Sequence, residues 1–252
     1  MQGPTGTLTT PGLVGLAAVA AVAALGGCVA SGEDGSMLVL KSVAPPITAT
    51  GGVCMFMPSD TEGELPRGVL DVSGGVGYQF VAQVASRITA DPGQEAARTI
   101  FFRGANVDLT FPDAGALGAQ IADLQSKGLL HFMSSISGDL PPNGLADKSF
   151  ELIPRGVAAE LNTAAGFTST VVQATFTVVG DMGGGNVSSQ PFHYSVTLGK
   201  QNLITDLGPC SSVSKSFMPH TGNLCAPGQD FPVDCCESSA TTLKCPAVGT
   251  GP

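Results

Sequence analysis

The sequence predicts a mainly β protein built as an antiparallel sandwich, with one or two short helices and a disulfide-rich C-terminal tail. In several short segments, apolar and polar residues alternate with the two-residue period of a β-strand. Glycine (34 residues) and proline (18 residues) recur between these segments, and cysteines gather near the C-terminus. Many short strands separated by frequent turns are typical of sandwiches and barrels.

The clearest strand pattern is a pair of segments within residues 168–198. Apolar residues occupy alternate positions, at Val172, Ala174, Phe176 and Val178, and again at Phe192, Tyr194, Val196 and Leu198. The glycine run between Asp181 and Asn186 predicts a hairpin turn between them. Two half-apolar faces need a second sheet to cover them, so we predict a sandwich, immunoglobulin-like or similar.

The other strands are predicted from shorter patterns. They cover residues 37–43, 53–57, 68–73, 78–88, 99–111, 129–136 and 149–153. Arg103-Gly104 falls inside one of them and predicts a β-bulge.

Two segments have helical features. Residues 114–127 fit either a helix, capped by Asp113 and ended by Gly128, or a strand. Pro154 suits the first position of a short helix that Gly166 would end, and we expect this helix to pack across one end of the sheets.

The chain opens with an apolar, uncharged run from Leu13 to Leu25. A stable membrane-spanning helix needs roughly 20 apolar residues, so this run is more typical of a signal-peptide core. Leu25-Gly26-Gly27-Cys28 closes it and resembles the lipobox of bacterial lipoproteins, in which the cysteine thiol carries a diacylglycerol. Residues 1–11 lack the Lys or Arg of an ordinary leader. The alternative is a secretory signal cleaved nearby.

The lipobox predicts how the chain is organised and where it is held. Residues 1–27 would be a lipoprotein signal peptide, 28–36 a flexible tether, 37–200 the β-sandwich and 201–252 a Cys-rich segment. Acylated Cys28 would attach the protein to a lipid bilayer, because two or three acyl chains such as palmitate hold stably where one does not. Val29, in place of an acidic residue, favours the outer membrane of a bacterial envelope, on its periplasmic or surface face.

Six cysteines remain once Cys28 is set aside. They are Cys54, Cys210, Cys225, Cys235, Cys236 and Cys245. Outside the cytoplasm an even number of this kind predicts three disulfides. The neighbours Cys235 and Cys236 are too close for relaxed disulfide geometry, and the other pairings stay open.

A metal site is the sharper alternative for the tail. It would combine His220 and Asp234 with Cys225, Cys235 and Cys236, but the close C-x2-C or H-x3-H spacing of zinc ligands is missing. We therefore predict neither a metal nor a cofactor.

Composition and motifs also exclude several functions. The net charge is −9 with only 11 Lys and Arg, which argues against nucleic-acid binding. No G-x-S-x-G surrounds any serine, and each of the histidines His131, His193 and His220 is expected to be a satisfied or solvated side chain. We therefore predict that the protein is not an enzyme.

The lipobox, the strand pair at 168–198 and the tail from Cys225 to Cys235 (CAPGQDFPVDC) resemble a family of predicted surface and outer-membrane lipoproteins from myxobacteria and related delta-proteobacteria. That family has no assigned activity. The resemblance implies a location at the envelope and a β-sandwich with disulfides, and nothing catalytic.

The function expected from the sequence is a structural or partner-binding role at the cell envelope, with the partner an unknown envelope protein. The alternative is an envelope protein that binds a small ligand or a metal. A hydrolase with a dispersed site is the third hypothesis. A pocket with convergent polar groups would favour the small-ligand hypothesis. A serine, a histidine and an acid within hydrogen-bond reach of one another would favour the hydrolase.

Overall fold

The computed structural model describes residues 35–44, 63–113, 115–223, 226, 228–239 and 242–247. All of them belong to one compact unit, Gly32–Pro252, which includes both the predicted sandwich and the predicted Cys-rich segment. The predicted signal peptide, Cys28, Cys54, Cys225 and the strand expected at 53–57 lie outside the described residues.

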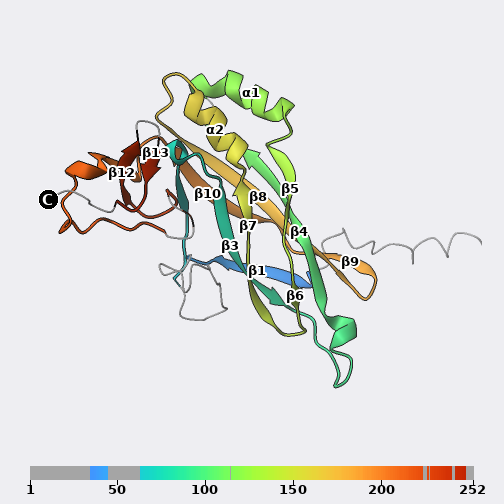
Figure 1. The fold of residues 1–252 in the computed structure, drawn as a ribbon. Helices are drawn as coiled ribbons and strands as arrows, with labels where there is room; N and C mark the ends of the chain where they lie inside the picture. Colours follow the sequence, from blue (N-terminus) through green and yellow to red (C-terminus); the bar gives the residue numbers. More distant parts are fainter. Residues whose placement is uncertain are drawn as a thin grey trace, which may run out of the picture. The chain divides into compact units, whose positions relative to one another are not determined.

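One sheet has three antiparallel strands in the order β1-β3-β7 (Figure 1). They are β1 (Met37–Ser42), β3 (Tyr78–Ser86) and β7 (Leu145–Ile153). The strands predicted at 37–43 and 78–88 are confirmed, and the one predicted at 149–153 begins earlier.

The second sheet has seven strands among the described residues, with the main order β2-β10-β8-β4-β5. These are β2 (Gly68–Asp71), β10 (Phe192–Gly199), β8 (Ser169–Met182), β4 (Ile100–Thr110) and β5 (His131–Ser135). Short strands extend it, β6 (Asp139–Leu140) beside β4 and β9 (Gly185–Ser188) beside β8. The two predicted strands correspond to β8 and β10, which pair antiparallel from Ser169–Gly199 to Phe176–Phe192. The predicted glycine turn instead joins β8 to β9, which pairs with the second half of β8.

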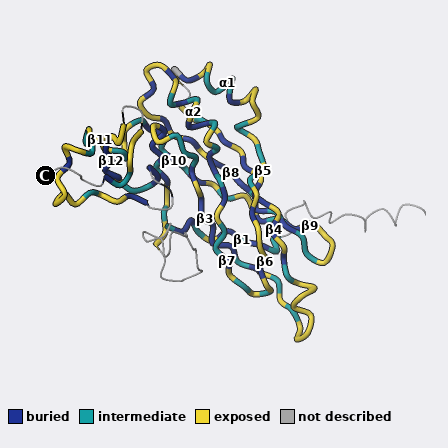
Figure 2. Tube along the Cα trace, viewed as in Figure 1, coloured by how far each residue is buried: buried dark blue, intermediate teal, exposed yellow. Residues whose placement is uncertain are grey.

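The inner faces of the two sheets enclose one core, whose buried positions run along the strands of both (Figure 2). Val172, Ala174, Phe176 and Val178 of β8 are all buried, as their period of two predicts. Phe80 of β3 meets Phe176 with ring centroids 5.0 Å apart and Tyr194 of β10 at 4.8 Å, both edge to face. Such aromatic pairs contribute about 0.5–1.5 kcal/mol each beyond the area that they bury. The predicted sandwich is confirmed.

The seven-stranded sheet and the C-terminal sheet each contain a parallel pair, which departs from the antiparallel pairing predicted for the sandwich. β2 pairs parallel with β10, and near the C-terminus β11 (Ile204–Pro209) pairs parallel with β12 (Val233–Ser239). Parallel neighbours need a long crossover connection, and the chain between β2 and β10 supplies most of the sandwich. The strand predicted at 68–73 ends at Asp71, where the 3-10 turn η1 (Val72–Gly74) begins.

The described residues form two α-helices, α1 (Gly118–Ser126) and α2 (Arg155–Thr163), at one end of the sandwich (Figure 1). Within the segment left open between helix and strand, residues 114–127, the structure has a helix over Gly118–Ser126. Asp113 is not its cap, because the 3-10 turn η3 (Gly115–Leu117) lies between them. Gly128 follows the helix at φ +69°, as predicted for a helix stop.

Helix α2 differs from its prediction by a residue or more at each end. Pro154 precedes the helix in extended conformation, with φ −61° and ψ 145°, and Arg155 opens it. The helix ends before Gly166 because Ala164 is already extended. Val157 and Leu161 are buried, so the helix packs on the sheets as expected. Two further 3-10 turns are η2 (Ala96–Arg98) and η4 (Cys210–Ser212).

The C-terminal segment forms a small third sheet in the order β11-β12-β13, where β13 is Thr242–Lys244. Two disulfides among the described residues hold it, Cys210–Cys236 and Cys235–Cys245. Its apolar cluster is small, with Val213 and Ala247 packed around Cys236. Covalent cross-links therefore replace much of the core that so short a segment cannot build.

Asp71, the last residue of β2, ties this segment to the sandwich. Its buried carboxylate accepts hydrogen bonds from the backbone N–H groups of Gln201 (3.2 Å), Leu203 and Ile204 (both 3.0 Å). The N–H and the hydroxyl of Ser73 donate to it as well. Burial acts to raise the pKa of Asp71, but the hydrogen bonds from Ser73, Leu203 and Ile204 outweigh it, and the pKa is lowered.

Gln229 and Asp230 make the second attachment. The side-chain amide of Gln229 accepts from the backbone N–H of Gln79 (2.9 Å) and donates to its carbonyl (2.7 Å), as a neighbouring peptide unit would. The Asp230 carboxylate accepts from the Val69 N–H (2.9 Å) and the buried Tyr78 hydroxyl (3.1 Å). Burial raises the pKa of both Asp230 and Tyr78. The chain thereby covers its own edge strand β2.

Replacing Asp71 with Asn should destabilise the fold by about 2–4 kcal/mol, because hydrogen bonds to a charged group contribute about 1.5–3 kcal/mol each. The lowered pKa makes the ionised form the stabilising one. The deficit should therefore be complete above the unfolded-state pKa of about 3.9 and shrink as the pH falls through the folded-state value. Urea unfolding at a series of pH values measures it.

Asp91→Asn is the matched control, because this carboxylate is exposed and hydrogen-bonds to no other described residue. It should change the free energy of unfolding by less than about 0.5 kcal/mol. A deficit for Asp71→Asn that stayed constant from pH 7 to pH 2 would contradict the assigned role of the ionised carboxylate.

Candidate functional site

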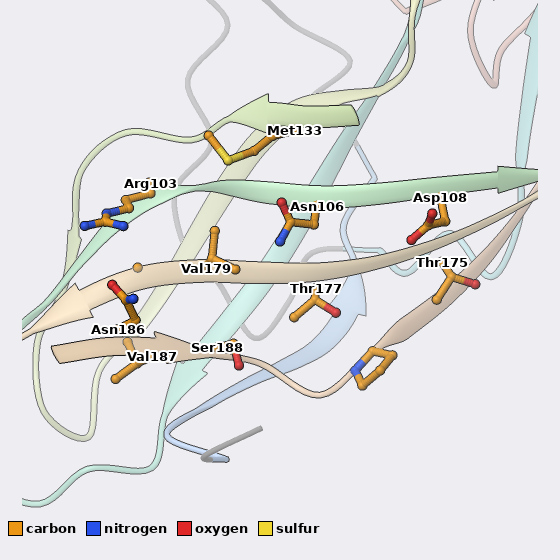
Figure 3. A pocket seen from close by; sticks show the side chains of 12 residues that line it. Arg103, Asn106, Asp108, Met133, Thr175, Thr177, Val179, Asn186, Val187 and Ser188 are labelled. Atoms are coloured by element: carbon orange, nitrogen blue, oxygen red, sulfur yellow. The ribbon is translucent and has the colours of Figure 1, made fainter. Parts of the chain in front are cut away.

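An open groove of about 700 Å³ lies on the outer face of the seven-stranded sheet. Its floor is formed by β4 and β8, and its sides by Met133 of β5 and by residues 186–191 (Figure 3). We refer to it as the groove, lined by Arg103, Asn106, Asp108, Met133, Thr175, Thr177, Val179, Gly180, Asn186, Val187, Ser188 and Pro191.

The strand period and register bring the floor residues together. On β8 the residues between the buried positions face outward, so Thr175 and Thr177 lie on the groove side. Asn106 of β4 is the register partner of Thr177, and Asp108 is the partner of Thr175. Directly opposed residues on antiparallel strands have Cβ atoms about 4.5–5.5 Å apart. Two adjacent strands thus present four polar side chains to one space.

A β-bulge in β4 sets where the groove begins. The register with β8 shifts between Phe102 and Gly104, where the sequence predicted a bulge. A Cβ at Gly104 would lie 2.5 Å from the carbonyl oxygen of Ser134, so only glycine lets β5 approach β4 this closely. The bulge leaves Arg103 exposed at the start of the groove.

Charged side chains occupy the two ends of the groove, and each has a partner. At one end Arg103 Nε lies 2.5 Å from Asp181 Oδ2, and at the other Asp108 Oδ1 is hydrogen-bonded to Nδ1 of His131. These pairs are solvent-exposed, so each contributes only about 0–1 kcal/mol to stability. Their consequence for binding is that neither charge is free.

Neutral polar side chains lie between the charged residues of the groove, and three of them are open to a ligand. Asn106, Thr177 and Asn186 make no side-chain hydrogen bond to any described residue, and they come from three adjacent strands, β4, β8 and β9 (Figure 3). Val179 lies among them on the same face of β8. The arrangement offers amide and hydroxyl donors and acceptors around an apolar side chain.

The histidines do not assemble a hydrolytic site within the described part of the chain. Each holds one partner at Nδ1: His131 with Asp108, His193 with Thr175 (3.0 Å), and His220 with Asp234 (2.9 Å). A hydroxyl and an acid never meet at the same ring, as a nucleophile, base and orienting acid must. All three are satisfied side chains, as the sequence predicted.

The described cysteines are cross-linked, which overturns the metal alternative for the tail. Cys235 and Cys236 each belong to a disulfide, to Cys245 and Cys210, so neither offers a thiolate ligand. No cluster of three or more His, Cys, Asp or Glu side chains able to hold a metal occurs among the described residues. The excluded Cys235–Cys236 bond is not formed.

The remaining predicted site residues, Cys28, Cys54 and Cys225, lie outside the described residues. Lipidation of Cys28 therefore stays a prediction. Across the described ranges, no helix has both the length and the apolar character needed to cross a bilayer.

The sequence pattern alone does not reveal the groove. Each lining strand carries an ordinary polar outer face, and β9 overlaps the glycine run between Asp181 and Asn186 that predicts a turn. The available signal was the uncharged pair Thr175 and Thr177 on β8 together with Asn106 on β4. Their adjacency depends on the pairing of β4 with β8, which are far apart in the sequence.

No protein-family model matches the sequence, and no curated protein matches it. Among solved structures the chain is similar to AggA, the major subunit of aggregative adherence fimbriae type I from Escherichia coli. This likeness covers 54% of the chain and 91% of AggA, at 15% identity and a TM-score of 0.25. Likeness of that degree carries no argument about function, and the resemblance to myxobacterial lipoproteins stays a prediction.

The observed disulfides predict the partner of Cys54. Four of the six cysteines bond to one another, so in an oxidising compartment we expect Cys54 to pair with Cys225. Mass spectrometry of a non-reduced proteolytic digest should detect that bond beside Cys210–Cys236 and Cys235–Cys245. A digest reduced beforehand is the control. Alkylation of Cys54 as a free thiol in protein folded under oxidising conditions would show the expectation to be wrong.

Proposed function

We propose that the protein is a lipid-anchored, extracytoplasmic binding protein of a bacterial envelope, and that the groove is its contact surface. The observation that carries the proposal is the set of neutral side chains that make no side-chain hydrogen bond to a described residue: Asn106 and Thr177 at the centre of the groove, and Asn186 toward its Arg103 end. Polar groups that converge on one space without bonding to each other are typical of a binding site. The bound molecule would be recognised by hydrogen bonds rather than by charge.

A binding role without catalysis is supported by the chemistry of the groove. Its ionisable residues Arg103 and Asp108 are exposed and already paired, whereas catalytic groups usually sit where burial perturbs them. Thr175 meets His193 without an acid to orient the ring. The proposal is therefore a partner-binding protein and not an enzyme.

The location rests on two independent features. Leu25-Gly26-Gly27-Cys28 after an apolar run supports acylation of Cys28, and Val29 supports the outer membrane. The two disulfides of the C-terminal segment support a compartment outside the cytoplasm, because cytosolic thiols are kept reduced.

A small-ligand role is the second candidate. The groove volume of about 700 Å³ falls within the range of about 300–1,000 Å³ typical of small-molecule sites. Against it, the groove lies open on a sheet face, whereas such sites enclose most of their ligand. We therefore place the larger, partner-binding role first.

Cross-linking in intact envelopes tests the groove. A photoreactive residue at position 177 should form a covalent adduct with the bound partner, because Thr177 lies on the groove floor. Gln173, on the outward-facing side of the same strand but outside the groove lining, is the matched control position. SDS gels and mass analysis report the adduct. Equal labelling from both positions, or none from 177, would remove the groove as the contact surface.

The anchor is tested separately by replacing Cys28 with Ser. The variant should leave the membrane fraction and appear as soluble protein, because an acylated cysteine supplies the attachment in this proposal. Fractionation with immunoblotting measures the distribution, and mass analysis of the mature wild-type N-terminus reports the acyl groups. A Ser variant that still sediments with membranes shows that the attachment lies elsewhere.

A further inference from the structure

The pairing of charges limits what the groove can bind. Arg103 already bonds Asp181, and Asp108 already bonds His131, so an ionic ligand would compete with an existing, weakly held partner for either charge. The net charge of −9 further opposes a polyanionic ligand. These observations favour a neutral molecule that binds through hydrogen bonds.

The backbone of β4 and β8, which form the floor, further limits the kinds of molecule that the groove can bind. β4 and β8 are paired with each other from Phe101–Asp181 to Thr110–Gln173, and β8 also pairs with β9 and β10. Their main-chain groups are therefore occupied, and an extended peptide cannot add to this face as another strand. Only side chains that project from the floor reach a bound molecule.

The side chains themselves offer a specific combination. Asn106, Thr177 and Asn186 supply amide and hydroxyl groups that both donate and accept, and they surround Val179. Met133, 58% exposed, adds apolar surface on one side. A sugar ring has the complementary pattern, because hydroxyls that donate and accept surround faces of C–H groups.

We propose that the groove binds a neutral glycan, and this inference rests on the proposed binding function of the same site. The glycan chain lies along β4 and β8 between Arg103 and Asp108, a span of about 15 Å at 3.2–3.4 Å per strand residue, which accommodates a few sugar units. Its hydroxyls bond Asn106, Thr177 and Asn186, and its C–H faces contact Val179 and Met133. Ring stacking does not contribute, because no aromatic side chain is among the described residues that line the groove.

Saturation-transfer NMR tests the proposal with the mature Cys28→Ser chain. The probes are neutral tetrasaccharides of glucose, mannose and N-acetylglucosamine, with a tetragalacturonate of the same length as the anionic comparison. At least one neutral probe should bind at millimolar concentration, and the anionic probe should bind less well. Asn106→Ala and Thr177→Val should each weaken that binding at least fivefold, whereas Gln173→Ala should leave it unchanged. Circular dichroism verifies that each variant is folded.

Failure of every neutral probe to bind at 10 mM, stronger binding of the galacturonate, or equal affinity of Asn106→Ala and Gln173→Ala would overturn the inference. Cross-linking from position 177 separates this result from the proposed function. A protein adduct formed there, together with absent sugar binding, would leave the groove as a contact surface and remove the glycan. Absence of both would remove the binding function as well.

Discussion

Edge-to-face packing of aromatic rings between the two sheets is the contact on which the rest of the structure depends. Phe80 of the three-stranded sheet lies against Phe176 and Tyr194 of the larger one, and the rings fill the space between the sheets. Because this packing buries one face of every central strand, the opposite face must carry side chains that tolerate water. Because the inner face of β4 and β8 packs in the core, their outer face is polar, and the groove lies on this outer face.

The C-terminal segment depends on that sandwich more than on its own interior. Its apolar cluster is small, so disulfides constrain it and hydrogen bonds to β2 and β3 hold it in place. Asp71 gathers backbone donors from the start of the segment, and Gln229 imitates a strand neighbour for Gln79. These contacts also cover β2, whose exposed main-chain groups would otherwise invite pairing with another chain.

The groove combines rigidity with unused hydrogen-bonding capacity. Its side chains project from strands whose backbones are locked by the sheet ladder, so little conformational entropy is lost when a partner binds. Arg103 and Asp108 at the ends of the groove already have side-chain partners, while Asn106 and Thr177 stay available in the middle. An open surface of this kind suits an extended polar molecule better than a reaction that must exclude water.

Local patterns in the sequence determined the strands β8 and β10, the bulge at Arg103-Gly104 and the helix stop at Gly128. These features depend on residues a few positions apart, where side-chain period and glycine conformation act directly. The tertiary structure alone decided the parallel pairing of β2 with β10 and the adjacency of Asn106 and Thr177. It also decided the attachment of the C-terminal segment through Asp71. Strand order and register are set by packing between segments that are distant in the chain. The local period of one segment does not indicate which other strand pairs with it.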